Sequence, residues 1–247
     1  MRQRRGGIQA RRLSQWVVRA TLLLAIAAGM AAALRADESS TIYPSIREQQ
    51  PLRQYRAYRR MHARSEHFGQ EAWVEAWTEL NGQSFTYTIV SEKGSDYIRN
   101  KVLKAVLKRE QELVADGECS RSELTLENYT FEETTAGDSE RYVTLKPKRK
   151  DLLLVDGRMV LSQDGSELLR VEGRLAKNPS FWTSLVNVIR HYTRIDGVRV
   201  PIATESTAKV KFAGVSHLDV HYEYDTINGR PVSVAARRAF PPAAGLR

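Results

Sequence analysis

The clearest helical pattern in the chain runs from Ser95 to Asp116. Apolar side chains recur there at spacings of three and four residues: Ile98, Val102, Ala105, Val106 and Leu113. This spacing is typical of an amphipathic helix with one apolar stripe. Ser95 is suited to cap the helix and Gly117 to end it. Three lysines fall outside the stripe and are expected to face solvent: Lys101, Lys104 and Lys108.

Most of the remaining chain alternates apolar and polar residues with the two-residue period of β-strands. Five Asn-Gly or Asp-Gly dipeptides separate these runs: Asn81-Gly82, Asp156-Gly157, Asp164-Gly165, Asp196-Gly197 and Asn228-Gly229. Both residues of such a dipeptide accept the positive φ that a tight hairpin turn requires. We therefore predict a mainly β (α+β) fold of about ten antiparallel strands in a meander, with one helix.

The first of these hairpins predicts one apolar and one amphipathic face. A two-residue loop at Asn81-Gly82 places Leu80 opposite Gln83 and Ala76 opposite Tyr87. Opposed residues share a face. The apolar face then carries Val74, Ala76, Phe85, Tyr87 and Ile89, and the other carries Trp73, Glu75, Trp77, Glu79, Thr86 and Thr88.

The next two hairpins predict apolar residues on both faces. A turn at Asp156-Gly157 pairs Leu154 with Met159, Leu152 with Leu161 and Leu153 with Val160, and a turn at Asp164-Gly165 pairs Leu161 with Leu168 and Val160 with Leu169. An antiparallel sheet that is wet on one side alternates apolar and polar residues. This part of the sheet must therefore be covered on both sides, or one side must line an apolar cavity.

The N-terminal residues have the pattern of an export signal. Six arginines and no acid occupy residues 1–19, an apolar run follows from Ala20 to Leu34, and Ala31, Ala33 and Ala36 offer small-residue cleavage sites. A basic region, an apolar region and a small-residue exit make a signal peptide. We predict a signal peptide at 1–36, a linker at 37–53, one β domain at 54–235 and a loose tail at 236–247.

Removing the signal peptide changes the meaning of the charge. The full chain has 38 Lys and Arg, 29 Asp and Glu, and a net charge of +9. Seven of the arginines lie in residues 1–36, so the remainder carries 31 basic against 29 acidic residues, a balance of +2. This near-neutral balance argues against nucleic acid as a partner. The single cysteine, Cys119, allows no internal disulfide.

His217, Asp219 and His221 form the sharpest metal-ligand candidate. On a strand all three share a face, but the two histidines stand roughly 13 Å apart at ~3.3 Å per residue, too far for one ion. We interpret the segment as an outer polar face that Glu223 and Asp225 continue. The sequence holds no P-loop, nucleophile elbow or zinc-protease motif. We expect no enzyme activity, no metal and no cofactor.

Two basic clusters invite an anionic partner. Lys146, Lys148, Arg149 and Lys150 surround Pro147 and suit either a solvated loop or a lipid headgroup. Across Asp196-Gly197, Arg194 is predicted to lie opposite Arg199, with Arg190 on the same face. Like charges across strands repel. Either a nearby carboxylate or a bound anion would relieve this repulsion, and we favour the carboxylate.

Pro179 interrupts the strand pattern in the segment from Lys177 to Trp182. Phe181 and Trp182 follow it at once. These two aromatic residues either guard the mouth of an apolar pocket or anchor the start of a strand in the core.

Three stretches resemble a known family: LLRVEGRLAKNPSFW (168–182), RHYTRIDGVRVP (190–201) and YEYDTINGR (222–230). They are similar to the bacterial periplasmic outer-membrane lipoprotein-sorting (LolA/LolB-like) family over residues 54–235. The resemblance implies an unclosed antiparallel β-barrel with a helix packed on its concave face, and an apolar cavity that shields acyl chains. No position here matches the lid-gating arginine of those carriers, and the segment from Glu118 to Lys150 is long.

We therefore predict an exported, periplasmic, monomeric protein that binds a lipid or an acylated protein. The residues expected to line the cavity are Val74, Ala76, Phe85, Tyr87, Leu153, Val160, Phe181 and Trp182. Burial of an acyl chain would drive binding at ~0.8 kcal/mol per CH₂ group. The alternative is a regulatory or interaction module on the same fold that binds an envelope protein, with peripheral membrane contact. An enzyme on a β scaffold is the third hypothesis.

Overall fold

The computed structural model describes residues 50–134, 140–180, 183–211 and 214–233. The predicted signal peptide (1–36), most of the predicted linker (37–53) and the predicted tail (236–247) lie outside the described residues. So do Phe181 and Trp182.

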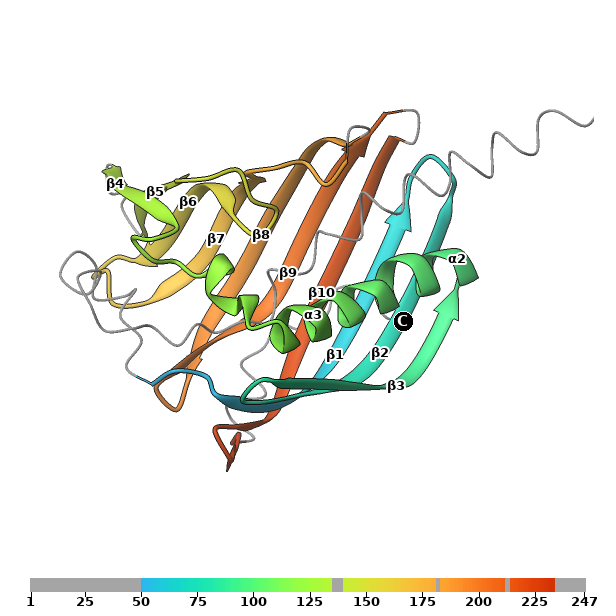
Figure 1. Cartoon of the computed structure of the whole chain (residues 1–247), viewed down its shortest axis with the longest axis horizontal. Helices are drawn as coiled ribbons and strands as arrows, with labels where there is room; N and C mark the ends of the chain where they lie inside the picture. Colours follow the sequence, from blue (N-terminus) through green and yellow to red (C-terminus); the bar gives the residue numbers. More distant parts are fainter. Residues whose placement is uncertain (1–49, 135–139, 181–182, 212–213, 234–247) are drawn as a thin grey trace, which may run out of the picture.

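The described chain forms one curved antiparallel sheet that does not close on itself (Figure 1). Its strands are β1 (Gln54–Ser65), β2 (Gln70–Asn81), β3 (Ser84–Gly94), β4 (Tyr129–Thr134), β5 (Glu140–Pro147), β6 (Val155–Ser162), β7 (Leu168–Leu175), β8 (Thr183–Ile195), β9 (Val198–Val210), β10 (Gly214–Ile227) and β11 (Arg230–Pro231). The mainly β fold class with an unclosed sheet and one helix is confirmed.

The strand order shows that the sheet is not a single meander. It runs β3-β2-β1-β10-β9-β8-β7-β6-β5-β4, with β11 paired to β10. The first strand therefore pairs with the last long strand. Two meanders, β1–β3 and β4–β10, join through this pairing, and the helix carries the chain from one outer edge to the other.

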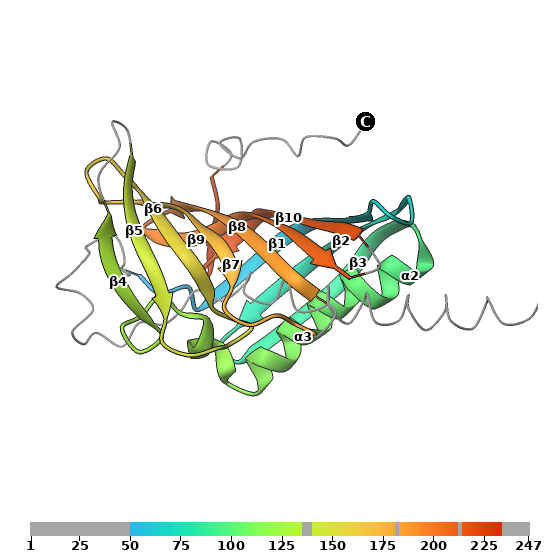
Figure 2. The same cartoon turned by 90° about the horizontal axis from the view of Figure 1, so that it is seen from above.

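One helix covers part of the concave face (Figure 2). It consists of α2 (Asp96–Ile98), a π-helical turn η3 (Arg99–Leu103) and α3 (Lys104–Ala115), followed by the short 3-10 helix η4 (Glu118–Ser122). It packs mainly on β1, β2 and β3. Gly117 ends it at a φ of 67°, as predicted, whereas the hydroxyl of Ser95 donates to Gln70 and caps no helix N–H group.

The π-helical turn shifts the apolar stripe of the helix. Leu103, Leu107 and Val114 join the predicted buried positions, while Ala105 is half-buried. A wider turn inserts one extra residue, which rotates every later side chain around the axis. Lys101 and Lys108 face solvent as predicted, and Lys104 is partly covered and lies 2.6 Å from Glu92.

Three of the five predicted turns form as expected; of the other two, one is shifted by a residue and one does not form. Asp196 and Gly197 have φ of 49° and 83°, and Asn228 and Gly229 have 47° and 78°. Asp164-Gly165 also lies in a turn, where Leu161 pairs with Leu168. The bulge beside that pair sets Val160 opposite Arg170, so the predicted pairing of Val160 with Leu169 is wrong.

The prediction of a turn at Asp156-Gly157 is wrong. Both residues lie inside β6, where Gly157 pairs with Gly173 of β7 and Leu145 of β5. The predicted pairs between 152–154 and 159–161 therefore do not form. A Cβ atom on Gly157 would lie 2.1 Å from the carbonyl oxygen of Glu172. Gly157 therefore permits the close approach of β6 and β7, and this accounts for a glycine at this position without a turn.

The first hairpin keeps its predicted faces with a different register. Asn81 pairs with Ser84, Leu80 with Phe85 and Ala76 with Ile89, so the loop residues are Gly82 and Gln83. A shift by two residues preserves the face of every side chain. Val74, Ala76 and Phe85 are buried as predicted. The described residues contain no helix that is both apolar enough and long enough to cross a membrane.

Candidate ligand-binding interior

A continuous row of side chains crosses the concave face from β5 to β2. Pairing by pairing it contains Val143, Met159, Val171, Arg190, Thr204, Val220, Met61 and Val74. The six apolar members are at most 5% exposed. This row is therefore apolar from β5 to β2, except at Arg190 and Thr204 in its middle.

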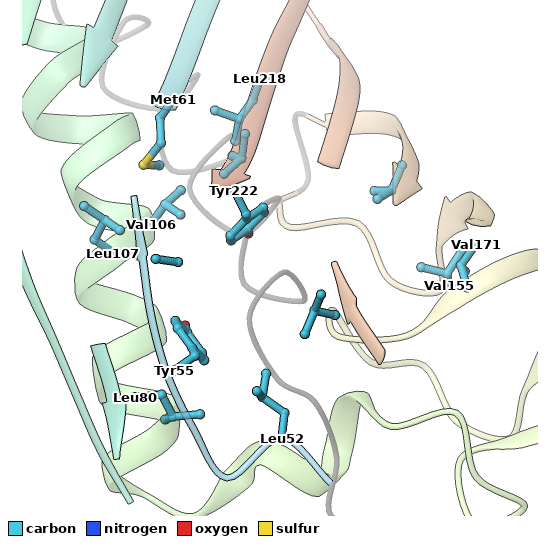
Figure 3. Packing of buried hydrophobic residues seen from close by; sticks show 14 of the residues in the cluster. Leu52, Tyr55, Met61, Leu80, Val106, Leu107, Val155, Val171, Leu218 and Tyr222 are labelled. Carbon is cyan, nitrogen blue, oxygen red and sulfur yellow. The ribbon is translucent and has the colours of Figure 1, made fainter. Parts of the chain in front are cut away.

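The helix covers one end of this row. Figure 3 shows Met61 on the same side of the interior as Val106 and Leu107 of the helix, Tyr55 near Leu80, and Val155 and Val171 on the other side. We call β1–β3 and the helix the helix half, and β5–β8 the far half. Tyr222 lies between the labelled groups of the two halves in this view.

The helix half contains a fully buried ion pair. Arg59 of β1 and Glu110 of α3 are each 1% exposed, and they meet through two hydrogen bonds of 2.5 Å and 2.9 Å. The Arg59 guanidinium also donates to the hydroxyl of Tyr55 at 2.6 Å and lies 4.7 Å from the ring centroid of Tyr222. Burial alone would lower the pKa of Arg59, but the Glu110 carboxylate holds it well above its usual value.

This ion pair fastens the helix to the sheet. Neither residue was singled out from the sequence. The available signal was positional: Glu110 falls on the buried stripe of α3, and Arg59 lies between inward-facing Ala57 and Met61 in the alternation of β1. A charge at such a position indicates a buried partner.

The far half contains a second inward-facing arginine, Arg190, whose hydrogen-bond partners differ from those of Arg59. Arg190 of β8 lies between Val171 and Thr204 in the cross-sheet row. Its Nη1 donates to the hydroxyl of Tyr192 over 3.4 Å. Within the described part of the chain its Nε and Nη2 atoms are buried without a hydrogen-bond partner, and so is Oγ1 of Thr204.

The positive charge of Arg190 affects the pKa values of two buried tyrosines, Tyr129 and Tyr222. Burial raises the pKa of Tyr129 to about 12, and burial likewise raises the pKa of Tyr222 to about 12. Arg190 opposes both shifts, because a nearby cation stabilises the phenolate. Tyr129 belongs to β4 and Tyr222 to β10, so the guanidinium lies between strands from the two sides of the sheet.

The other arginines of the predicted basic face have partners. Arg194 pairs with Arg199 across the turn as predicted. Its guanidinium lies 3.0 Å from a carboxylate oxygen of Glu167 and donates to the carbonyl of Gly197. The favoured intramolecular carboxylate is therefore confirmed for Arg194, whereas Arg190 has none among the described residues.

The predicted lining residues divide between two faces. Val74, Ala76 and Phe85 are buried on the inner face beside the helix, with Tyr87 partly buried against the same core. Leu153 is buried in the connection before β6. Val160 is buried and shares its face with its cross-strand neighbours Tyr142 and Arg170, on the side of β6 opposite to Met159.

The outer face carries the histidines. His217, Asp219 and His221 point outward from β10, as predicted, and Glu223 and Asp225 continue their face. His217 lies 2.8 Å from Glu66 and His62 lies 3.1 Å from Glu71. No group of three metal-ligating side chains gathers around one point in the ranges that the structure describes.

The outer face of the far half is hollowed by a shallow groove. Its volume is about 710 Å³. One cross-strand row in its wall contains Thr144, Arg158, Glu172 and Ile189. Arg158 and Glu172 lie 2.5 Å apart. The charges of these two side chains therefore neutralise each other in the wall of the groove.

The basic cluster around Pro147 is tied to the protein. Lys146 pairs with Glu132 at 2.6 Å. Arg149 donates to the side chain of Asn128 at 2.7 Å and lies 3.4 Å from Asp151. These contacts favour the structural interpretation of this loop over a lipid-binding one.

Comparison with known proteins gives the following result. No protein-family model and no curated protein matches the chain. Among solved structures it is similar to a LolA superfamily protein from Nitrosomonas europaea, at 13% identity over 84% of this chain and 99% of that one, with a TM-score of 0.35. It is also similar to a DUF1329 family protein from Desulfovibrio piger, at 12% identity over 71% and 87%, with a TM-score of 0.32. The first of these two structures carries the name of the superfamily that the sequence resembles.

Proposed function

We propose that this chain is an exported cell-envelope protein that binds an acyl chain of a lipid or lipoprotein against the concave face of its sheet. The observation that supports this proposal is the row of side chains that crosses the concave face. Apart from Arg190, its members in both halves are apolar, whereas the helix packs mainly on β1–β3. The sheet therefore presents a wider hydrocarbon surface than its own helix covers.

The proposal has a structural requirement. Met159, Val143 and Val171 are buried in this structure, so a ligand must separate them from whatever covers them. Binding would replace contacts within the protein by contacts with the ligand, and the favourable contribution is the removal of the acyl chain itself from water. Because apolar contact is non-directional, it distinguishes poorly between ligands. Selectivity for chain length would then be modest.

Native mass spectrometry of the purified chain tests this function. We expect co-purified lipid, and we expect hydrogen exchange in β5–β8 to slow when a fatty acyl probe is added. A chain that carries no lipid and binds no acyl probe would refute the carrier function.

A second function is favoured by the outer groove. A shallow groove that contains Arg158 and Glu172 suits a short segment of a protein partner. Crosslinking of the protein in its native envelope would identify such a partner. A substitution of Ile189, which lines the groove, should then abolish the crosslink without changing acyl-probe binding.

A further inference from the structure

The unpartnered atoms of Arg190 form one edge of its guanidinium. Nε and Nη2 lack a hydrogen-bond partner in the described residues, and their hydrogens point in nearly the same direction. This edge matches the two oxygens of a carboxylate or a phosphate, which accept both hydrogens at once.

No carboxylate among the residues that the structure describes pairs with this edge. The buried acids of the described chain are Glu110 and Asp151. Glu110 is bound to Arg59, and Asp151 to Arg121 and Arg149. Arg190 as a whole is half-buried, but its Nε and Nη2 atoms are buried. Buried polar atoms without a partner are costly, and native structures normally satisfy them.

Two hydroxyl side chains share the face of the sheet that carries Arg190. Thr204 is the direct cross-strand neighbour of Arg190, and Tyr222 lies two residues beyond Val220, the neighbour of Thr204. The oxygen atoms Oγ1 of Thr204 and Oη of Tyr222 are also buried without a partner in the described ranges. Hydroxyls donate hydrogen bonds to anions.

We propose that Arg190, Thr204 and Tyr222 bind the anionic head of an amphiphile whose acyl chain lies on the cross-sheet row. The head is a carboxylate or a phosphate. This inference rests on the proposed function and deepens it, because it names the class of ligand: an anionic lipid is preferred over a neutral lipid of the same chain length.

The flanking residues explain why the chain would follow the head. Val171 and Val220 stand on either side of Arg190 and Thr204 in the row, and Met159 and Met61 come next. A head fixed at the centre leaves apolar surface in both directions. The flexible methionine side chains adapt to a ligand that slides between them.

Displacement of the neutral probe N-phenyl-1-naphthylamine from the delipidated full chain tests this inference. The competitors are palmitate, palmitoyl lysophosphatidate and hexadecanol, which have the same chain length and differ in the head. We expect the preferred anion to bind about 10-fold or more tightly than hexadecanol. A preference for palmitate identifies a carboxylate head, and one for lysophosphatidate identifies a phosphate head.

The variant Arg190→Met should weaken binding of the preferred anion by about 10- to 100-fold and leave hexadecanol within about 2-fold. Arg190→Lys keeps the charge and loses the fork, so it should show an intermediate loss. Arg174→Met is the matched control, because Arg174 is a solvent-exposed arginine of β7; we expect no change there. Should Arg190→Met fail to fold, the Lys variant decides.

The outcomes separate the two proposals. Equal binding of palmitate, lysophosphatidate and hexadecanol, or an equal loss of all three in Arg190→Met, would overturn the anion site and leave the acyl-binding function standing. Absence of any binding by the unmodified chain would overturn both.

Discussion

Arg59 and Arg190 lie on the same concave face of one sheet, and their surroundings differ. Arg59 is 1% exposed and meets the Glu110 carboxylate, the Tyr55 hydroxyl and an aromatic ring. Arg190 has one long hydrogen bond to Tyr192 and, in the described chain, two nitrogen atoms without a partner. The Arg59 guanidinium is neutralised by a carboxylate, although its Nε also lacks a hydrogen-bond partner among the described residues. Arg190 has no carboxylate partner there.

The difference teaches how a buried charge indicates its role. A satisfied buried pair contributes mainly to the arrangement of the helix on the sheet, because desolvation offsets much of its attraction. An unsatisfied one lowers stability unless another molecule completes it. The hydrogen-bond partners of a buried charge therefore distinguish a structural role from a binding role better than the extent of its burial does.

The same substitution at the two arginines should have unlike effects, with the larger at Arg59. Arg59→Met leaves Glu110 buried without a cation, and we expect a loss of about 3–5 kcal/mol in the free energy of unfolding. Urea denaturation measures it. The double variant Arg59→Met/Glu110→Leu removes both charges and should recover most of the loss; a double variant as unstable as the single one would contradict the account.

Gly157→Ala should disturb the far half. The new methyl group would lie 2.1 Å from the Glu172 carbonyl oxygen and 2.5 Å from the Gly173 Cα atom, so two strands must separate. We expect a loss of about 1–3 kcal/mol in urea denaturation. Gly82→Ala is the comparison: it has a positive φ of 61° and no atom within 4 Å, so it should lose only about 1 kcal/mol.

Arg190→Met should have a smaller effect, of opposite sign to that of Arg59→Met. It removes a cation that has no carboxylate partner in the described chain, so the ligand-free protein should gain up to about 1 kcal/mol. Thermal unfolding of the delipidated chain, with and without palmitate, measures this. A marked destabilisation of the ligand-free variant would mean that Arg190 has a structural role comparable with that of Arg59.

A pH-dependent effect concerns the segment that joins η4 to β4. Burial, together with the neighbouring charge of Glu127, raises the pKa of Glu123 from 4.5 to about 7. The folded state thus holds this proton more tightly than the unfolded state. Its stabilising contribution is complete below about pH 4.5 and is lost as the pH rises through about 7.

Glu123→Gln should make the melting temperature less dependent on pH between pH 5 and pH 8. The melting temperature should rise near pH 8, because the amide carries no charge. Glu127→Gln removes only the neighbouring charge and should reduce the pH dependence of the melting temperature by a smaller amount. An unchanged pH profile in Glu123→Gln would refute the raised pKa.

Local sequence signals predicted many of the elements correctly. The helical stripe gave a helix within one residue of each observed end, because its apolar spacing and Gly117 are local properties. The turns at Asp196-Gly197 and Asn228-Gly229 followed for the same reason. Asp156-Gly157 misled because a glycine tolerates close strand approach as readily as a turn, and which of the two it serves depends on Gly173, a residue on another strand.

The sequence alone determined that the chain is mainly β, that one amphipathic helix lies in it, and that His217, Asp219 and His221 share an outward face, since periodicity encodes which residues share a face. Only the tertiary structure decided that β1 pairs with β10, that Glu110 completes Arg59, and that Arg190 has no such partner in the described chain. Those facts depend on residues far apart in the chain, and the electrostatics of a buried charge depend on which of them reach it.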